Sequence, residues 1–329
     1  MNLSQPSSYI LITGHRKSGT TLLHKLFDGH PELNTYPVDI SLLYGFLASR
    51  SKYTNEQDIK NRINHVIKKS TISLREKILL GIGREFNSEE FCECFWESTS
   101  PGNLTDAFSI IEAISSSWCR YSQSDPKKPF LLKETSQSIF AYRLIANSIP
   151  LKIIQIIRDP RDNYAAIKAG SSYYYTMGEG QNEALASLIN RSRMDLRCAA
   201  EFIKLKHTWF KAIKFEDLAS KPIESMKTLA EFCCISFTAD LLTPTILGAD
   251  FSGNNHDGKL FDGVSSANVS RWKERISDHE ASIIEFWMRD VMLEWNYMPE
   301  FNSHTIVESF SHFYEWYNQK YFYYDSFSV

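Results

Sequence analysis

The chain has 329 residues, of which 43% are apolar, so it can bury a large core, and we expect a single domain over residues 1–329. Its 36 Lys and Arg nearly balance its 39 Asp and Glu, so no overall field would attract nucleic acid or an anionic membrane. The six cysteines lack zinc-site spacing, which predicts reduced thiols and no bound metal. The N-terminal residues do not resemble a signal peptide and no segment has the apolar length of a membrane span, so we expect a cytoplasmic protein.

Strand-like and helix-like segments alternate along the chain. Residues 9–13 are β-prone and end at Gly14, and residues 20–28 carry apolar residues at helical spacing. Residues 151–157 form a nearly continuous apolar run, typical of a parallel strand covered on both faces, and a helix is expected from Pro160 to about Gly170. A third strand is predicted over 209–215 and a helix over 222–233. This alternation predicts an α/β fold, a parallel sheet flanked by helices with ligands at the carboxyl ends of its strands.

The remaining segments surround this predicted sheet. Residues 42–124 show helical patterning and predict an inserted helical cap over the ligand pocket. Residues 181–206 predict one long amphipathic helix, and residues 250–270, rich in Gly, Asn, Ser and Asp, predict a mobile loop over the site. The tail, residues 300–329, is dense in aromatic residues and is expected to pack on the core.

The segment between the first strand and the first helix has the composition of a phosphate cradle, Gly14-His15-Arg16-Lys17-Ser18-Gly19-Thr20-Thr21. Backbone amides in such a turn point at an anion together with the helix N-terminus, and the glycines allow close approach. P-loop kinases place Lys directly after the second glycine, where this chain has Thr20, and they need a metal-binding acid at the end of a later strand. Here one later strand ends in Arg158. A P-loop kinase or NTPase, or a non-catalytic nucleotide-binding module, therefore remains only as an alternative.

Two anion-binding patterns resemble those of sulfotransferases that use 3'-phosphoadenosine 5'-phosphosulfate (PAPS). Lys17-Ser-Gly-Thr-Thr21 resembles their 5'-phosphosulfate loop, and Arg158-Asp-Pro-Arg161 after a strand resembles their 3'-phosphate element. The resemblance implies that Arg158 binds the 3'-phosphate, whereas Arg161 pairs either with the nucleotide or with a nearby carboxylate. It implies that these residues surround the 5'-phosphate: Arg16, Lys17, Ser18, Gly19, Thr20 and Thr21.

The resemblance extends to a late segment and departs from the family at one position. Ser270-Arg271-Trp272-Lys273 resembles the segment that closes over the nucleotide, which makes Arg271 and Lys273 candidate phosphate ligands and Trp272 either a base-stacking platform or a core anchor. The family usually has a Ser eight residues after the first Arg, and this chain has Ala166 there. That hydroxyl contact is either absent or supplied by Ser171, Ser172 or Tyr164.

The resemblance implies transfer of a sulfuryl group from PAPS, without a metal, to a hydroxyl or amine of a glycan, a lipid or a small molecule. Such transfer needs in-line attack, a base for the acceptor proton, and cations for the leaving phosphate. Lys17 is the first cation, and Lys133 in Leu131-Leu132-Lys133-Glu134 resembles a second that contacts the transferred group. Asp39, Glu134 and His15 are the candidate bases, in that order, and none of them being the base also stays open.

Overall fold

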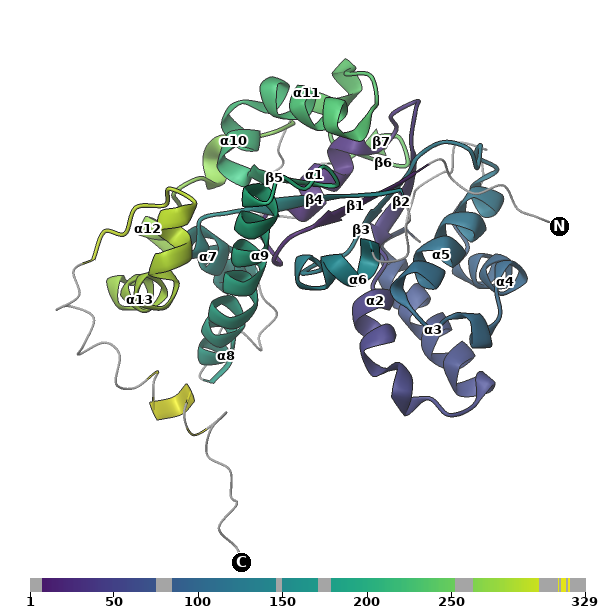
Figure 1. Cartoon of the computed structure of the whole chain (residues 1–329), viewed down its shortest axis with the longest axis horizontal. Helices are drawn as coiled ribbons and strands as arrows, with labels where there is room; N and C mark the ends of the chain where they lie inside the picture. Colours follow the sequence, from purple (N-terminus) through teal and green to yellow (C-terminus); the bar gives the residue numbers. More distant parts are fainter. Residues whose placement is uncertain are drawn as a thin grey trace, which may run out of the picture.

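A computed structural model describes residues 8–74, 85–145, 150–170, 179–251, 263–301, 313, 315–317 and 319. Within this part of the chain the centre is a five-stranded sheet in the order β2-β3-β1-β4-β5, with every neighbouring pair parallel (Figure 1). The strands are β1 (Tyr9–Thr13), β2 (Asn34–Asp39), β3 (Phe130–Lys133), β4 (Leu151–Ile157) and β5 (Phe210–Lys214). The predicted α/β fold, a parallel sheet flanked by helices, is confirmed.

Helices cover both faces of the sheet, which explains the continuous apolar runs of its central strands. Ile10 and Ile12 of β1 belong to the core shared with α1 (Thr20–Phe27), α10 (Phe215–Ser220) and α11 (Pro222–Cys233). Tyr9 and Leu11 alternate with them and enter the core on the other face, together with residues of α6 (Ala141–Ile145) and α9 (Arg193–Lys204). Figure 1 shows α10 and α11 on one side of the sheet and α6 and α9 on the other.

The secondary-structure elements described between β2 and β3 are all helical. Its elements are α2 (Leu42–Gly45), η1 (Leu47–Lys52), α3 (Glu56–Ser70), η2 (Ile72–Leu74), α4 (Ser88–Ser98), η3 (Pro101–Asn103) and α5 (Ala107–Ser122). Asn55, Asn87 and Asp106 cap the N-termini of α3, α4 and α5 with their side chains. Aromatic residues hold the group together, with the Trp118 ring 5.7 Å from that of Phe91. These helices lie at the lower right of Figure 1.

A third group of helices packs beyond β4 and β5 around its own apolar core. It contains α7 (Pro160–Gly170), α8 (Glu179–Ser187), η6 (Leu188–Ser192), α9, α12 (Trp272–Arg275) and α13 (Asp278–Glu294). The single helix expected over 181–206 is wrong in one respect, because η6 is a π-helical turn between α8 and α9. Ser277 and Glu280 form a capping box at the start of α13.

Shorter elements connect these groups. They are η4 (Ser138–Phe140), η7 (Ala239–Leu242), the hairpin of β6 (Thr245–Ile246) and β7 (Ala249–Asp250), and η8 (Ser266–Asn268). Of the loop predicted over 250–270, residues 252–262 lie outside the described part, as does most of the aromatic tail. Phe313 of that tail is buried in the apolar core of the third group of helices, here called the third core. No helix among the described residues is long and apolar enough to cross a membrane.

Candidate functional site

The loop between β1 and α1, residues 14–19 and here called the first loop, closes tightly against the end of β4. Gly14 has φ 148°, and a Cβ there would lie 2.3 Å from the Ile156 carbonyl oxygen. Gly19 has φ 105°, and a Cβ there would lie 2.6 Å from Cδ2 of Phe215. A side chain at either position would therefore push the loop off the sheet. Both glycines are required by packing as well as by backbone conformation.

The first loop delivers donors to the N-terminus of α1. The Ser18 amide donates to the His15 carbonyl at 3.1 Å and its hydroxyl donates to the same oxygen at 2.6 Å, which fixes the turn. Gly19 is the N-cap residue of α1, and no side chain of the described residues caps that terminus. The first amides of α1, at Thr20 and Thr21, therefore face an open N-terminus that favours an anion. Burial and the nearby Arg16 lower the pKa of the Lys17 ammonium. A bound anion would raise this pKa again, because it favours the charged form.

Arg158 at the end of β4 joins the first loop to the late segment of the chain. Its Nη1 donates to the Lys17 carbonyl at 3.0 Å and its Nη2 donates to the Asn268 carbonyl at 2.6 Å. Its guanidinium carbon lies 4.4 Å from the centroid of the Phe215 ring, and the side chain is almost wholly buried. Its Nε is buried without a hydrogen-bond partner among the described residues. Arg158 and Lys17 therefore lie at one edge of the sheet, and the arginine keeps a donor unused.

Asp162 holds the late segment against the same edge. Its carboxylate accepts from the backbone amides of Ser270 at 2.6 Å and Trp272 at 2.8 Å. Arg271, between them, is half-buried and donates to the Asn268 side chain at 3.2 Å. The Trp272 indole is buried in the third core with the Arg161 guanidinium carbon 4.4 Å from its ring centroid. Arg271 and Arg158 therefore both donate to Asn268, and the Trp272 ring lies in the core.

Three other sequence candidates lie apart from this edge. Lys273 is exposed and forms an ion pair of 2.7 Å with Glu300. Arg161 forms buried ion pairs with Asp159 at 2.7 Å and with Glu285 at 2.6 Å, so its charge is already matched by carboxylates. The Tyr164 hydroxyl donates to Glu280 at 2.9 Å, whereas Ser171 and Ser172 lie outside the described residues.

Lys133 and Asp39 meet at the carboxyl ends of β3 and β2. They are register partners in the sheet, and Lys133 Nζ lies 2.6 Å from Asp39 Oδ1 and 3.5 Å from the Thr21 hydroxyl. The β2–β3 pairing shifts register between Thr35 and Asp39, a bulge that includes Pro37, which has no amide to donate. The buried Lys133 is thereby placed between the start of α1 and a carboxylate whose side chain is 39% exposed.

Side chains of α1 hold the irregular part of β2 in place. His24 Nε2 lies 2.8 Å from the Tyr36 carbonyl, and Lys25 Nζ donates to the Pro37 carbonyl at 2.5 Å. Because a carbonyl can only accept, His24 carries its proton on Nε2. Burial, with the charges of Lys25 and Lys133, holds the pKa of His24 well below its usual range. The histidine is therefore a neutral support of the strand that carries Asp39.

Glu134, the residue after Lys133, is buried. Its side chain points into the protein, and its Oε2 has no hydrogen-bond partner among the described residues. Burial, followed by the negative charge of Asp39, raises the pKa of Glu134 to about 8, against the opposing effect of Lys133. At neutral pH this carboxyl mostly retains its proton. Of the two acids next to Lys133, Asp39 is therefore the accessible one.

Two further histidines occupy structural positions. His15 is buried, and burial followed by the charges of Arg16 and Arg191 lowers its pKa to about 3, so its imidazole is neutral. His30 lies 2.9 Å, through Nε2, from the Ser236 carbonyl and accepts the Glu32 amide at its Nδ1, which fixes the corner after α1.

The sequence reasoning overlooked residues that support the first loop. Asn163 donates from Nδ2 to the Arg16 carbonyl at 2.8 Å, and the Ser136 amide donates to the Gly14 carbonyl at 3.0 Å. Burial raises the pKa of Asp195 to about 7, and the nearby Ser136 opposes this rise. Asn163 lies two residues after the Arg158-Asp-Pro-Arg161 pattern, and that position was the one available signal. Asp195 is 59 residues from Ser136, and only the fold brings them together.

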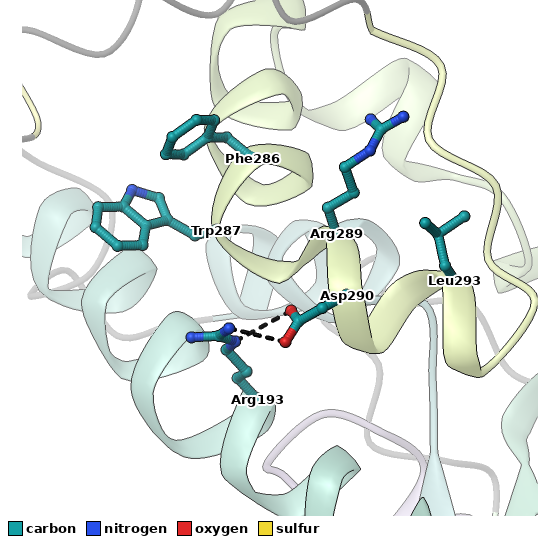
Figure 2. Close-up of a pocket in the computed structure, with 6 residues that line it drawn as sticks. All are labelled: Arg193, Phe286, Trp287, Arg289, Asp290 and Leu293. Atoms are coloured by element: carbon teal, nitrogen blue, oxygen red, sulfur yellow. Dashed lines mark hydrogen bonds and ion pairs between the residues drawn. The ribbon is translucent and has the colours of Figure 1, made fainter.

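A surface hollow of about 460 Å³ lies elsewhere, between α9 and α13 (Figure 2). Its lining residues are Arg193, Phe286, Trp287, Arg289, Asp290 and Leu293. None of them is a candidate from the two phosphate patterns or from the Lys133–Asp39 pair, and Arg193 is ion-paired with Asp290 at 2.8 Å. This hollow is therefore not the site assembled by the sheet.

Solved structures with the same arrangement exist. The sulfotransferase domain from the Synechococcus PCC 7002 olefin synthase is 17% identical, with 91% of this chain and 98% of that chain covered and a TM-score of 0.51. The sulfotransferase domain from the curacin biosynthetic pathway is 16% identical, with 90% of this chain and 99% of that chain covered and a TM-score of 0.51. Retinol dehydratase in complex with androsterone and the inactive cofactor PAP is 15% identical, with 88% of this chain and 82% of that chain covered and a TM-score of 0.41. At these identities the first two show a common fold.

No curated protein matches the sequence. The model of the sulfotransferase family, in contrast, matches residues 9–239, a range that runs from β1 through the first loop, the Lys133–Asp39 pair and Arg158 to the start of η7. The chain therefore belongs to the sulfotransferase family.

Proposed function

We propose that the protein transfers a sulfuryl group from PAPS to a hydroxyl or amine of a glycan, lipid or small-molecule acceptor. The observation that carries the proposal is the hydrogen bond of 3.0 Å between Arg158 Nη1 and the Lys17 carbonyl. It places the two phosphate patterns, 141 residues apart in sequence, at one edge of the sheet. One nucleotide with a phosphate at each end of its ribose can reach both.

The residues at this edge fit such a nucleotide. The uncapped N-terminus of α1 and the ammonium of Lys17 suit the 5'-phosphate. The buried Nε of Arg158, without a partner among the described residues, and the neighbouring Arg271 suit the 3'-phosphate. Arg158 is the central ligand in this assignment because both of its Nη atoms already hold backbone around the site.

The Lys133–Asp39 pair suits the transfer itself. The donor supplies an activated sulfuryl group, whose S–O bond to the 5'-phosphate breaks while a new S–O bond to the acceptor forms. Asp39 takes the acceptor proton, because it is accessible and lies 2.6 Å from Lys133, the lysine assigned to the transferred group. Lys17 and Lys133 stabilise the charge that the phosphate gains. The helices between β2 and β3 begin three residues after Asp39, so we assign them the role of the acceptor cap.

Nucleotide binding provides the first test. The desulfated product of the donor, 3'-phosphoadenosine 5'-phosphate (PAP), should raise the melting temperature of the protein more than ATP with Mg²⁺ does. Arg158→Gln should remove this advantage. Arg197→Gln, in an exposed pair with Asp290, is the matched loss of an arginine away from the site and should keep it. Equal stabilisation by ATP with Mg²⁺, or none by PAP, would contradict the proposal.

Transfer provides the second test. Radiolabelled PAPS, incubated with a panel of sugars, lipids, phenols and peptides, should label at least one acceptor. Asp39→Asn should lower kcat by about 10² to 10⁴ while PAP still stabilises the variant, as expected when a general base is lost. An unchanged kcat would remove Asp39 from the mechanism.

A further inference from the structure

Arg191 lies in the π-helical turn η6, between the first loop and the helices that follow β2. Its guanidinium carbon is 4.8 Å from the centroid of the Tyr44 ring in α2. Its charge also contributes to the lowered pKa of His15, behind burial and Arg16. π-helical turns change the direction of the side chains that follow and are frequent at functional sites. Arg191 is therefore close to both the first loop and α2.

The other arginines of this helical stretch have carboxylate partners. Arg193 and Arg197 both pair with Asp290, at 2.8 and 2.5 Å, whereas the contact described for Arg191 is the face of an aromatic ring. Asp195 is one helical turn away from Arg191, but burial raises its pKa to about 7, so it carries only part of a negative charge at neutral pH. Arg191 is thus a half-buried cation whose described neighbours are the Tyr44 ring and a carboxyl that is only partly charged.

An anion beside Arg191 would complete the neutralisation of its charge. The guanidinium can stack on Tyr44 and present its edge to a carboxylate or phosphate at the same time. The Tyr44 side chain is 56% exposed and offers an aromatic wall beside that edge. Tyr44 follows Asp39, at the end of β2, by five residues. In the strand order, β2 and β4 lie on opposite sides of the β3–β1 pair, so Tyr44 follows the strand on one side and Arg158 follows the strand on the other. An anion held between Arg191 and Tyr44 would therefore lie next to the helices that we assign to the acceptor cap.

We propose that Arg191 and Tyr44 bind an anionic group of the acceptor, so that the acceptor is a hydroxyl or amine compound that already carries a carboxylate, phosphate or sulfate. This inference rests on the proposed sulfuryl transfer and narrows it to negatively charged acceptors. Arg191 acts through substrate binding. Its replacement should raise the KM for an anionic acceptor, while the melting temperature shift caused by PAP stays as it is.

Matched pairs of acceptors test the assignment. We would compare 4-hydroxybenzoate with its methyl ester, and glucose 6-phosphate with glucose, using radiolabelled PAPS. The wild type should favour an anionic member by about tenfold or more in kcat/KM, the effect of one charge-assisted hydrogen bond. Arg191→Gln should abolish the preference through KM, and Arg191→Lys should keep part of it, since the charge stays and the fork is lost. Arg193→Gln is the matched control, because Figure 2 shows Arg193 directed at Asp290.

Binding measurements separate this inference from the proposed donor. With PAP present, 4-hydroxybenzoate or glucose 6-phosphate should raise the melting temperature of the wild type and of Arg193→Gln, but not that of Arg191→Gln. If PAP fails to stabilise the wild type while this Arg191-dependent effect persists, the donor is wrong and the anion site stands. If Arg191→Gln loses the PAP shift, Arg191 belongs to the donor site. That result, or the absence of any Arg191-dependent preference and stabilisation, overturns the inference.

Discussion

Replacement of Glu134 by Gln should change how stability depends on pH. The carboxyl is buried, and burial together with Asp39 raises its pKa to about 8 in the folded protein, whereas an unfolded Glu titrates near 4.5. Below about 4.5 the carboxyl is protonated in both states. Between about 4.5 and 8 the folded protein keeps the proton that the unfolded chain releases, so stability falls as pH rises. Gln has nearly the same shape and does not titrate, so the variant lacks this contribution.

The magnitude follows from one proton. Each pH unit inside this window changes the free energy of unfolding by up to about 1.4 kcal/mol. Between pH 5.5 and 7.5 the wild type should therefore lose up to about 2.7 kcal/mol relative to Glu134→Gln. The contributions of all other titrating groups are present in both proteins and cancel in the difference.

Urea unfolding of the two proteins at pH 5.5, 6.5 and 7.5 measures the effect, with equal m-values as the condition for comparison. Repetition at about 0.5 M NaCl is the control, because salt screens exposed charges and affects a buried one much less. A stability difference that does not change with pH would mean that Glu134 is ionised in the fold. The proton would then have to be assigned to another group beside Lys133.

Two further predictions concern packing and buried charge. Gly14→Ala should destabilise the protein by about 3 kcal/mol or more, because its Cβ would lie 2.3 Å from a backbone oxygen. The control, Gly102→Ala, has nothing within 4 Å of its Cβ and should change stability by less than about 0.5 kcal/mol. Thermal melts of both variants measure the difference. Arg161→Met should lower stability by about 3 to 5 kcal/mol in urea unfolding, because it leaves the fully buried Glu285 without its cation. The exposed Arg197→Met should lower it by less than about 1 kcal/mol, and equal losses from the two would refute the distinction.

The strands β1, β4 and β5 were predictable from sequence, whereas β2 and the four-residue strand β3 were not assigned. The runs over 9–13 and 151–157 correspond to β1 and β4, and 209–215 brackets β5. The strand β2 was overlooked because Pro37 and polar residues at a half-buried edge remove both the apolar run and the regular alternation. The π-helical turn within 181–206 was also overlooked, since the apolar periodicity continues through it.

The residue types of the candidate site could be selected from the sequence, whereas their contacts could not. The pattern of glycines and cations identified the first loop, and the resemblance identified Lys133 and Asp39 as candidates. Their separation of 2.6 Å depends on β2 and β3 being neighbours, which no local pattern encodes. Likewise, Lys273 and Arg271 look equivalent in sequence, and only the packing of α12 directs Lys273 to Glu300. That residues 1–329 form one domain stays a prediction.

The two backbone carbonyls held by Arg158 have a consequence for the entropy of binding. Lys17 and Asn268 are 251 residues apart, and one side chain fixes the backbone of both before any ligand arrives. The conformational freedom of these two segments is therefore lost during folding. Under the proposed function, a nucleotide between these two segments would meet a site with its shape already set, and more of its contact energy would appear as affinity.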